Sequence, residues 1–133
     1  MRQLQIALIA SVLSATAAQA QDIDCSNAQV QLEMTFCAER EWQIADADLN
    51  AAYGAAQVMM KAVDADLTKD QQGAALTLRD AQRAWVTFRD AACAAEGYPS
   101  RGGSIEPMII YACRARLTQG RAADLWSLSQ QGE

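Results

Sequence analysis

The sequence predicts an all-α domain, a small antiparallel helical hairpin or bundle of three to four helices that two disulfides hold together. Apolar residues recur at steps of three and four over long stretches, as on one face of a helix. No alternating pattern typical of strands competes with them. The connections between these stretches are short, which makes neighbouring helices antiparallel.

The first 20 residues have the pattern of a secretory signal peptide. A positive start at Arg2, an apolar run over 4–13 and a small-x-small sequence predict cleavage near Ala20. The run is too short for a spanning helix, and the acidic residues before Cys25 argue against a lipid anchor. We therefore expect one soluble domain over 21–133, periplasmic or secreted, with no membrane insertion after cleavage.

The charge is negative and unevenly distributed. Removing Arg2 from the 11 bases leaves 10 against 16 acids, so the predicted mature chain carries 10 − 16 = −6. Ten acids and three bases lie in 21–70, but six acids and seven bases in 71–133. This balance argues against a nucleic-acid partner. The acidic half can attract a cationic partner, and a solvated acidic surface explains the same charge.

The pattern of the first long helix is clear from Trp42 to Val63, where apolar residues hold one face for about six turns. A helix-compatible run precedes it from Val30, without a well-marked start. The connection is expected over 64–72. There Thr68 and Gln71 have the spacing of a capping box for the second helix.

The second helix is expected to be central and to end at Gly97. Its apolar stripe has the spacing of one helical face and consists of Leu78, Ala81, Trp85, Phe88 and Ala92. We expect Trp85 and Phe88 in the core, with Arg89 beside the stripe.

The third helix is predicted to start at Ser104 as its N-cap, with Pro107 in the first turn. Its apolar face consists of Ile109, Ala112, Cys113 and Leu117. Thr118 or Gly120 is expected to break this helix before its last apolar residues.

The four cysteines indicate two disulfides, because an even number in a small exported chain is typical of a disulfide framework. A zinc site is disfavoured, since the chain has no histidine and no Cys-x-x-Cys pair. Geometry permits Cys25 with Cys37 and Cys93 with Cys113. It also permits Cys37 with Cys93 and Cys25 with Cys113.

Polar residues are predicted to meet across the seam of the first two helices, because a turn centred near residues 67 and 68 brings them opposite one another. The pairs are Asp46 with Arg89, Asn50 with Trp85, and Tyr53 with Gln82. A ligand site and a structural network both fit this pattern. We favour the network, because buried polar groups need partners and then specify the packing.

Catalysis is hard to assemble from these residues, so we expect no enzyme and no cofactor. Without histidine there is no Ser-His or Cys-His nucleophile. Two acid pairs are close in sequence, Glu39 with Glu41 and Asp46 with Asp48. Residues two apart on a helix point to different faces, so neither pair converges as glycoside hydrolysis requires.

Two groups of residues are candidates for binding a partner. The acidic group on the first helix contains Glu39, Glu41 and Asp48. The loop over 97–104 contains Tyr98, Ser100 and Arg101. A loop anchored between two helices can enter a partner's cleft, and a plain connection is the alternative.

Several spaced motifs together resemble the lysozyme inhibitor LprI-like family over residues 24–125. They are Cys25, Ala28, Glu33 and Cys37; Asp46-x-x-Leu49-Asn50-x-x-Tyr53; Gln82-Arg83-x-Trp85-x-x-Phe88-Arg89-Asp90-x-x-Cys93; Gly103-Ser104; Cys113; and Leu117-Thr118-x-x-Arg121.

The resemblance implies an exported, helical, disulfide-bonded domain of bacterial envelopes. It also implies that Cys93 pairs with Cys113, leaving Cys25 for Cys37, because related sequences shorten the segment between the last two cysteines. The namesake of the family looks lipid-anchored, and this chain lacks that signal.

We therefore expect an exported inhibitor of lysozyme-type cell-wall hydrolases, with a cationic lysozyme-type protein as the partner. The alternative is an envelope interaction or scaffolding module with another partner. The sequence does not predict the oligomeric state.

Overall fold

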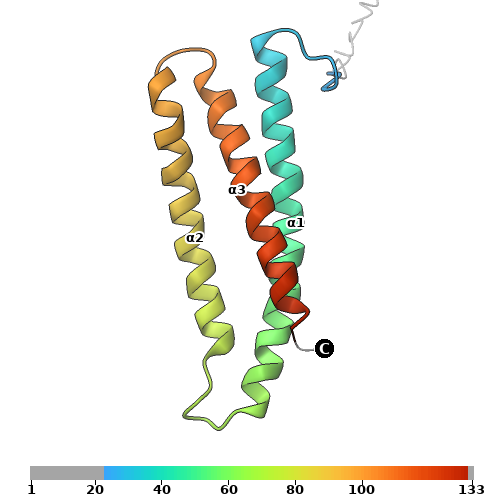
Figure 1. Ribbon diagram of the computed structural model, residues 1–133, viewed down its shortest axis with the longest axis vertical. Coiled ribbons are helices and arrows are strands. Elements are labelled where there is room, and N and C mark those ends of the chain that lie inside the picture. Colours follow the sequence, from blue (N-terminus) through green and yellow to red (C-terminus); the bar gives the residue numbers. More distant parts are fainter. Residues whose placement is uncertain (1–22, 132–133) are drawn as a thin grey trace, which may run out of the picture.

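The computed structural model describes residues 23–131 as three long helices and one short 3-10 helix (Figure 1). These elements are α1 (Gln31–Asp66), α2 (Ala74–Gly97), η1 (Tyr98–Ser100) and α3 (Glu106–Ser129). Within the described range there is no strand, and the predicted all-α fold is confirmed. The predicted signal peptide lies outside the described residues.

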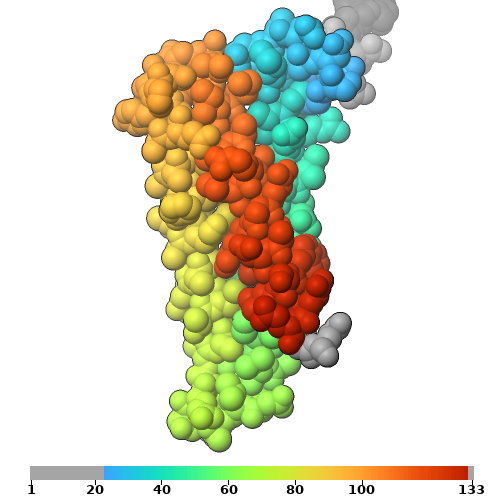
Figure 2. Space-filling model, in the orientation of Figure 1, coloured from blue at the N-terminus to red at the C-terminus, as the bar shows by residue number. Residues whose placement is uncertain are grey.

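The three long helices run alternately in opposite directions, as predicted, and α1 with α3 is the principal pair. Figure 2 shows α3 lying over the front of the hairpin formed by α1 and α2. The core joins all three helices and consists of Leu49, Ala52, Ala56, Leu78, Ala122 and Leu125. Ala52, Ala56 and Ala122 are fully buried. Their small side chains let α1 and α3 approach closely.

Helix α1 is one continuous helix of 36 residues. The predicted face is confirmed, with buried Ala45, Leu49, Ala52 and Ala56 along it. The helix-compatible run from Val30 belongs to the same helix, so α1 begins well before Trp42, where the sequence pattern becomes clear. The backbone N–H of Met34 donates to the carbonyl of Val30 (3.0 Å), which closes the first turn.

The buried face of α2 differs from the predicted stripe. Phe88 is 59% exposed and does not enter the core, whereas Arg89 is only 6% exposed. Arg89, Cys93 and Gly97 recur at steps of four and are all buried. The helix is therefore rotated so that the arginine lies at the centre of its inner face. The arginine faces inward because it donates to side chains of α1 and α3.

The predicted capping box at Thr68 is also wrong. The Thr68 hydroxyl donates to the side-chain oxygen of Gln71 (3.1 Å), and both residues lie in the connection before α2. The helix starts after Gly73, whose φ of 150° favours glycine. Asp64, near the end of α1, supplies the cap instead.

The Asp64 carboxylate accepts three backbone N–H groups at the start of α2. Oδ1 accepts from Gly73 and Ala74 (2.8 Å each), and Oδ2 accepts from Ala75 (3.1 Å). These are donors that a helix N-terminus leaves without intrahelical partners. The bonds from Gly73, Ala75 and Ala74 lower the pKa of Asp64 below its ordinary value of 3.8.

We expect Asp64→Asn to lower the melting temperature at neutral pH, because the neutral amide offers one acceptor oxygen. A lowered folded-state pKa stabilises the fold above the unfolded pKa, and this contribution is lost as the pH falls through the folded value. The difference from the unsubstituted protein should therefore shrink in acid below pH 3.8. Thermal unfolding monitored by circular dichroism across pH 2 to 7 measures it. Asp66→Asn is the control, and equal shifts for both variants would contradict the cap.

Helix α3 runs without interruption through Thr118 and Gly120, so the predicted break is wrong. Thr118 is fully buried and faces the other helices. Ser104 is not the N-cap either, since Ile105 occupies that position. Pro107 does lie in the first turn, as predicted.

Gly97 ends α2 in the right-handed helical region, with φ of −74°, and not in the left-handed conformation that a glycine after a helix often adopts. A Cβ at this position would lie 2.7 Å from Cγ1 of Ile110 on α3. The glycine is therefore required by the close approach of two helices.

We expect Gly97→Ala to lower the free energy of unfolding by about 1–3 kcal/mol through overpacking. Gly54 in the middle of α1 is the matched control, because a Cβ there meets nothing within 4 Å. Gly54→Ala should raise the free energy by roughly 0.5–1 kcal/mol. Urea denaturation measures both values. A stabilised Gly97→Ala variant would show that Ile110 moves aside freely.

Both disulfides have the pairing that the resemblance implied. Cys25 is bonded to Cys37 and Cys93 to Cys113, at sequence separations of 12 and 20. The first bond ties the segment before α1 to that helix, and the second joins the upper ends of α2 and α3. Within residues 23–131, no helix has the length and apolarity needed to cross a bilayer.

Candidate functional site

Arg89 connects the three helices from the centre of the inner face of α2. Its guanidinium lies 5.5 Å from the ring centre of Trp42 on α1 and 5.3 Å from that of Trp85. It donates to Asp90 (3.0 Å), to Asp46 on α1 (3.4 Å) and to the Thr118 hydroxyl on α3 (3.5 Å). A planar guanidinium can stack on aromatic rings and donate at its edge at the same time. This combination explains how an arginine occupies the interior.

A second arginine, Arg114 on α3, extends this cluster and was missed in the sequence. Its guanidinium lies 4.9 Å from the ring centre of Trp42, and Nε lies 3.4 Å from the carboxylate of Asp90. Tyr111 of α3 stacks on the Trp42 ring, with 5.8 Å between the two ring centres. The steps from Tyr111 to Arg114 to Thr118 are three and four residues, which is the pattern that would have placed them on one face.

Of the three predicted pairs across the seam, only Asp46 with Arg89 makes a direct bond. The Asn50 amide donates along α1 to Oδ2 of Asp46 (3.3 Å). The Tyr53 hydroxyl accepts from Gln57 on the same helix (2.9 Å).

The other predicted partners lie elsewhere. The Gln82 side-chain oxygen accepts from Arg121 on α3 (3.0 Å). Trp85 packs against the core and under Arg89. Between α1 and α2, the polar network around Arg89 is thus followed along the helices by an open groove.

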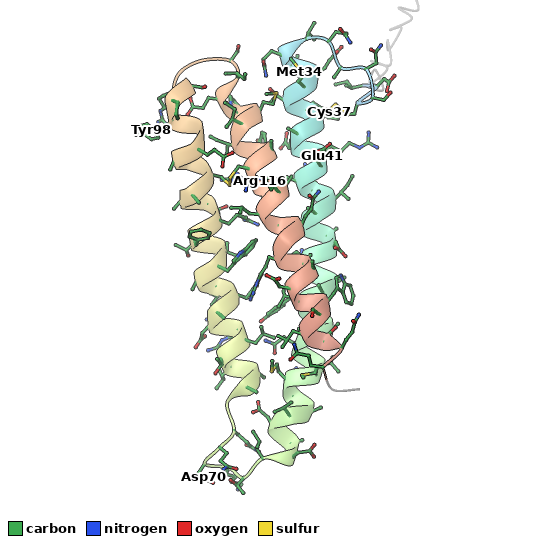
Figure 3. All side chains as sticks on the ribbon, viewed as in Figure 1. Met34, Cys37, Glu41, Asp70, Tyr98 and Arg116 are labelled. Carbon is green, nitrogen blue, oxygen red and sulfur yellow. A yellow bond between two sulfur atoms is a disulfide. The ribbon has the colours of Figure 1, made fainter. Side chains whose placement is uncertain are left out.

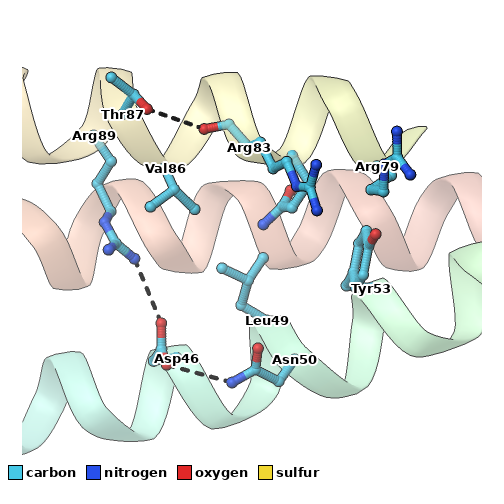
Figure 4. A pocket seen from close by; sticks show the side chains of 10 residues that line it. Asp46, Leu49, Asn50, Tyr53, Arg79, Arg83, Val86, Thr87 and Arg89 are labelled. Carbon is cyan, nitrogen blue, oxygen red and sulfur yellow. Dashed lines mark hydrogen bonds and ion pairs between the residues drawn. The ribbon is translucent and has the colours of Figure 1, made fainter. Parts of the chain in front are cut away.

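This groove between α1 and α2 has a volume of about 800 Å³. Figure 4 shows α2 forming one wall and α1 the other, with the ribbon of α3 behind them. The lining residues are Asp46, Leu49, Asn50, Tyr53, Arg79, Gln82, Arg83, Val86, Thr87 and Arg89. The groove exists because α2 contacts α1 sparsely, although the two helices are consecutive.

The acidic candidates on α1 do not form one cluster. Glu41 and Asp48 are exposed and seven residues apart, which places them near the same face. Glu39 is half-buried and points to a different side of the helix. The Asp48 carboxylate accepts from the indole N–H of Trp126 on α3 (3.0 Å).

The loop candidates lie away from these acids. In Figure 3, Tyr98 lies at the outer edge of α2 and Glu41 on α1, with α3 between them. Tyr98 is 62% exposed, and the guanidinium of Arg101 lies 5.0 Å from its ring centre.

The loop has a defined structure and is not an open glycine turn. Ser100 is half-buried in η1, and its carbonyl accepts from Gly103 (2.9 Å). The Glu106 carboxylate accepts from Arg101 (3.2 Å) and from the backbone of Gly102 (2.7 Å). These contacts hold Tyr98 and Arg101 at the end of the bundle.

The family model described as "Lysozyme inhibitor LprI" matches residues 24–125 of the chain. The chain belongs to this LprI family. The resemblance seen in the sequence motifs is confirmed. A family of inhibitors fits the expectation that the protein is not an enzyme. In residues 23–131, no three side chains of the metal-binding types gather at one place.

The chain is also similar to two known proteins. An uncharacterized protein of Rhizobium meliloti (strain 1021) is 39% identical over 119 residues, which cover 87% of this chain and 86% of the relative. A crystal structure of a DUF1311 family protein from Pseudomonas putida KT2440 has a TM-score of 0.64 at 26% identity. That likeness covers 74% of this chain and 93% of the other. The helical arrangement is therefore shared with a protein solved by experiment.

Proposed function

We propose that this LprI-family protein is exported and inhibits lysozyme-type cell-wall hydrolases by binding them. The family match over residues 24–125 is the observation that carries the proposal. Two disulfides in a small chain suit an oxidising compartment outside the cytoplasm. The charge distribution supports a cationic partner.

Helix α1 is the most acidic of the three helices, with a net charge of 2 − 7 = −5. It contains seven acids and two bases, whereas α2 has three of each and α3 has two acids and three bases. A surface of one sign attracts a partner of the other sign and raises its association rate. A strongly basic lysozyme-type enzyme is such a partner.

The acids on α1 differ in how free they are to meet a partner. Asp46, Asp48 and Asp64 already accept hydrogen bonds from α2 or α3. Among the described residues, no donor bonds to the carboxylates of Glu39 or Glu41, so each can accept from a partner on its own side of the helix. We place the first contact with the enzyme at this end of α1.

A lysis assay with purified residues 21–133 and several cationic lysozymes tests the proposal. We expect slower clearing of a cell-wall suspension at micromolar inhibitor. No inhibition of any enzyme would favour the alternative, a scaffolding module of the envelope. That alternative has its own support, because the outward surface of α1 exposes Leu32, Ile44 and Val58.

We expect Glu39→Gln with Glu41→Gln to slow association with the inhibited lysozyme about threefold to tenfold at low salt. The matched control is Asp80→Asn with Asp124→Asn, which changes the net charge equally but on α2 and α3. Biolayer interferometry measures both rates. The difference should disappear near 1 M salt, where exposed charges are screened. Equal slowing by both double variants would assign the effect to net charge and not to this end of α1.

A further inference from the structure

We infer that the groove between α1 and α2 binds a ligand that carries a carboxylate on a small, partly apolar body, with Arg83 and Arg79 as the anion-binding residues. This site lies apart from Glu39 and Glu41 and does not depend on lysozyme inhibition. The observations that carry the inference are the charge of Arg83 over the groove, which makes no ion pair within the described residues, and the composition of the groove walls.

The two arginines are four residues apart on α2 and therefore lie on one face. Figure 4 shows both over the groove, across from Tyr53 of α1. Arg79 pairs with its exposed sequence neighbour Asp80 (2.9 Å), and in the described part of the chain Arg83 makes no ion pair. Arginine donors in a planar fork match the two oxygens of a carboxylate.

The one acidic residue in the lining is already satisfied. Asp46 accepts from Arg89 through Oδ1 and from Asn50 through Oδ2. Arg89 is buried and held by two carboxylates, so it belongs to the interhelical network. With Arg79 paired to Asp80, the positive charge over the groove that makes no ion pair within the described residues is that of Arg83. A positive groove in a chain of net charge −5 is a local feature that the overall charge does not explain.

The rest of the lining favours a ligand with apolar atoms beside its charge. Leu49 and Val86 contribute apolar surface between the polar residues. The Tyr53 hydroxyl accepts from Gln57, so its own proton is free to donate to a ligand. A volume of about 800 Å³ lies in the range of small-molecule sites. Inorganic phosphate would use the arginines but not the apolar surface.

Calorimetric titration of residues 21–133 with acetyl-Ala-Ala tests the inference, with the amide of the same dipeptide as the neutral control. A second titration with N-acetylmuramic acid distinguishes an acidic sugar from a peptide as the source of the carboxylate. We expect one of the acids to bind and the amide to bind at least tenfold more weakly. Arg83→Gln should weaken the binding of that acid at least tenfold. Arg40 is an exposed arginine on α1, outside the groove. The Arg40→Gln variant should bind the acid like the unsubstituted protein.

Several results would overturn the inference. They are an absence of binding by both acids, equal binding of acid and amide, and equal affinities of the Arg83→Gln and Arg40→Gln variants. Inorganic phosphate that binds as tightly as the acids, with the same dependence on Arg83, would contradict the role of the apolar surface. Arg83 is exposed, so its loss leaves the fold intact. An unchanged circular dichroism melt checks this for each variant.

Discussion

Replacing both Cys93 and Cys113 with alanine is expected to lower the free energy of unfolding by about 3 kcal/mol. The chain-entropy model gives roughly this value for a loop of 20 residues. Both side chains are buried, at 0% and 2% exposure, so a packing loss adds to the entropic one. Because α2 contacts the other two helices sparsely, this bond is a large part of what holds its upper end in place.

Urea denaturation of residues 21–133 measures the effect, and Cys25→Ala with Cys37→Ala is the matched control. That bond closes a loop of 12 residues, and Cys25 is exposed in the segment before α1. Its removal should release this segment. It should lower the free energy of unfolding of the three-helix core much less than the loss of the Cys93–Cys113 bond does. A larger loss of stability from replacing Cys25 and Cys37 than from replacing Cys93 and Cys113 would contradict the role of the Cys93–Cys113 bond in holding α2.

Arg89→Ala is expected to lower the free energy of unfolding by about 2–4 kcal/mol. The substitution leaves a cavity between Trp42 and Trp85 and removes the bonds to Asp46 and Asp90. Both carboxylates are 44% exposed, so water relieves part of their loss. The greater part of the effect comes from the missing packing of the side chain.

Arg89→Met separates packing from charge, because it keeps a long unbranched side chain between the rings. We expect Arg89→Met to recover about half of the free energy of unfolding that Arg89→Ala loses. Arg83→Ala on the same helix is the control and should change stability by less than about 0.5 kcal/mol. Thermal and urea unfolding measure all three. If Arg89→Ala left stability unchanged but abolished partner binding, Arg89 would be a ligand-binding residue and not a structural one.

The sequence predicted those features that depend on periodicity and register. The inner face of α1 and the contact of Asp46 with Arg89 follow from helical spacing and an antiparallel turn. Phe88 was misplaced because periodicity scores an arginine as polar. Only the two indoles and the carboxylates around Arg89 show that a guanidinium can replace an apolar side chain there. Those neighbours come from two helices, α1 and α2, and the Thr118 hydroxyl adds a contact from α3.

The groove and the α2 cap could not be predicted in the same way. The groove depends on how far α2 leans from α1, which local patterns do not encode. Gln82 finds Arg121 on α3, although the turn had placed it opposite Tyr53. Asp64 lies nine residues before Gly73, outside the four-residue window in which a capping box is recognised.

The sparse packing of α2 has a consequence for local stability. Helices α1 and α3 form the main contact, so α2 can open as a unit while that pair stays intact. It would stay tethered at one end by the Asp64 cap and at the other by the Cys93–Cys113 bond. Backbone amides in the middle of α2 should then exchange with solvent before those of its partners. When α2 opens in this way, the groove between α1 and α2 should widen while α1 and α3 stay folded.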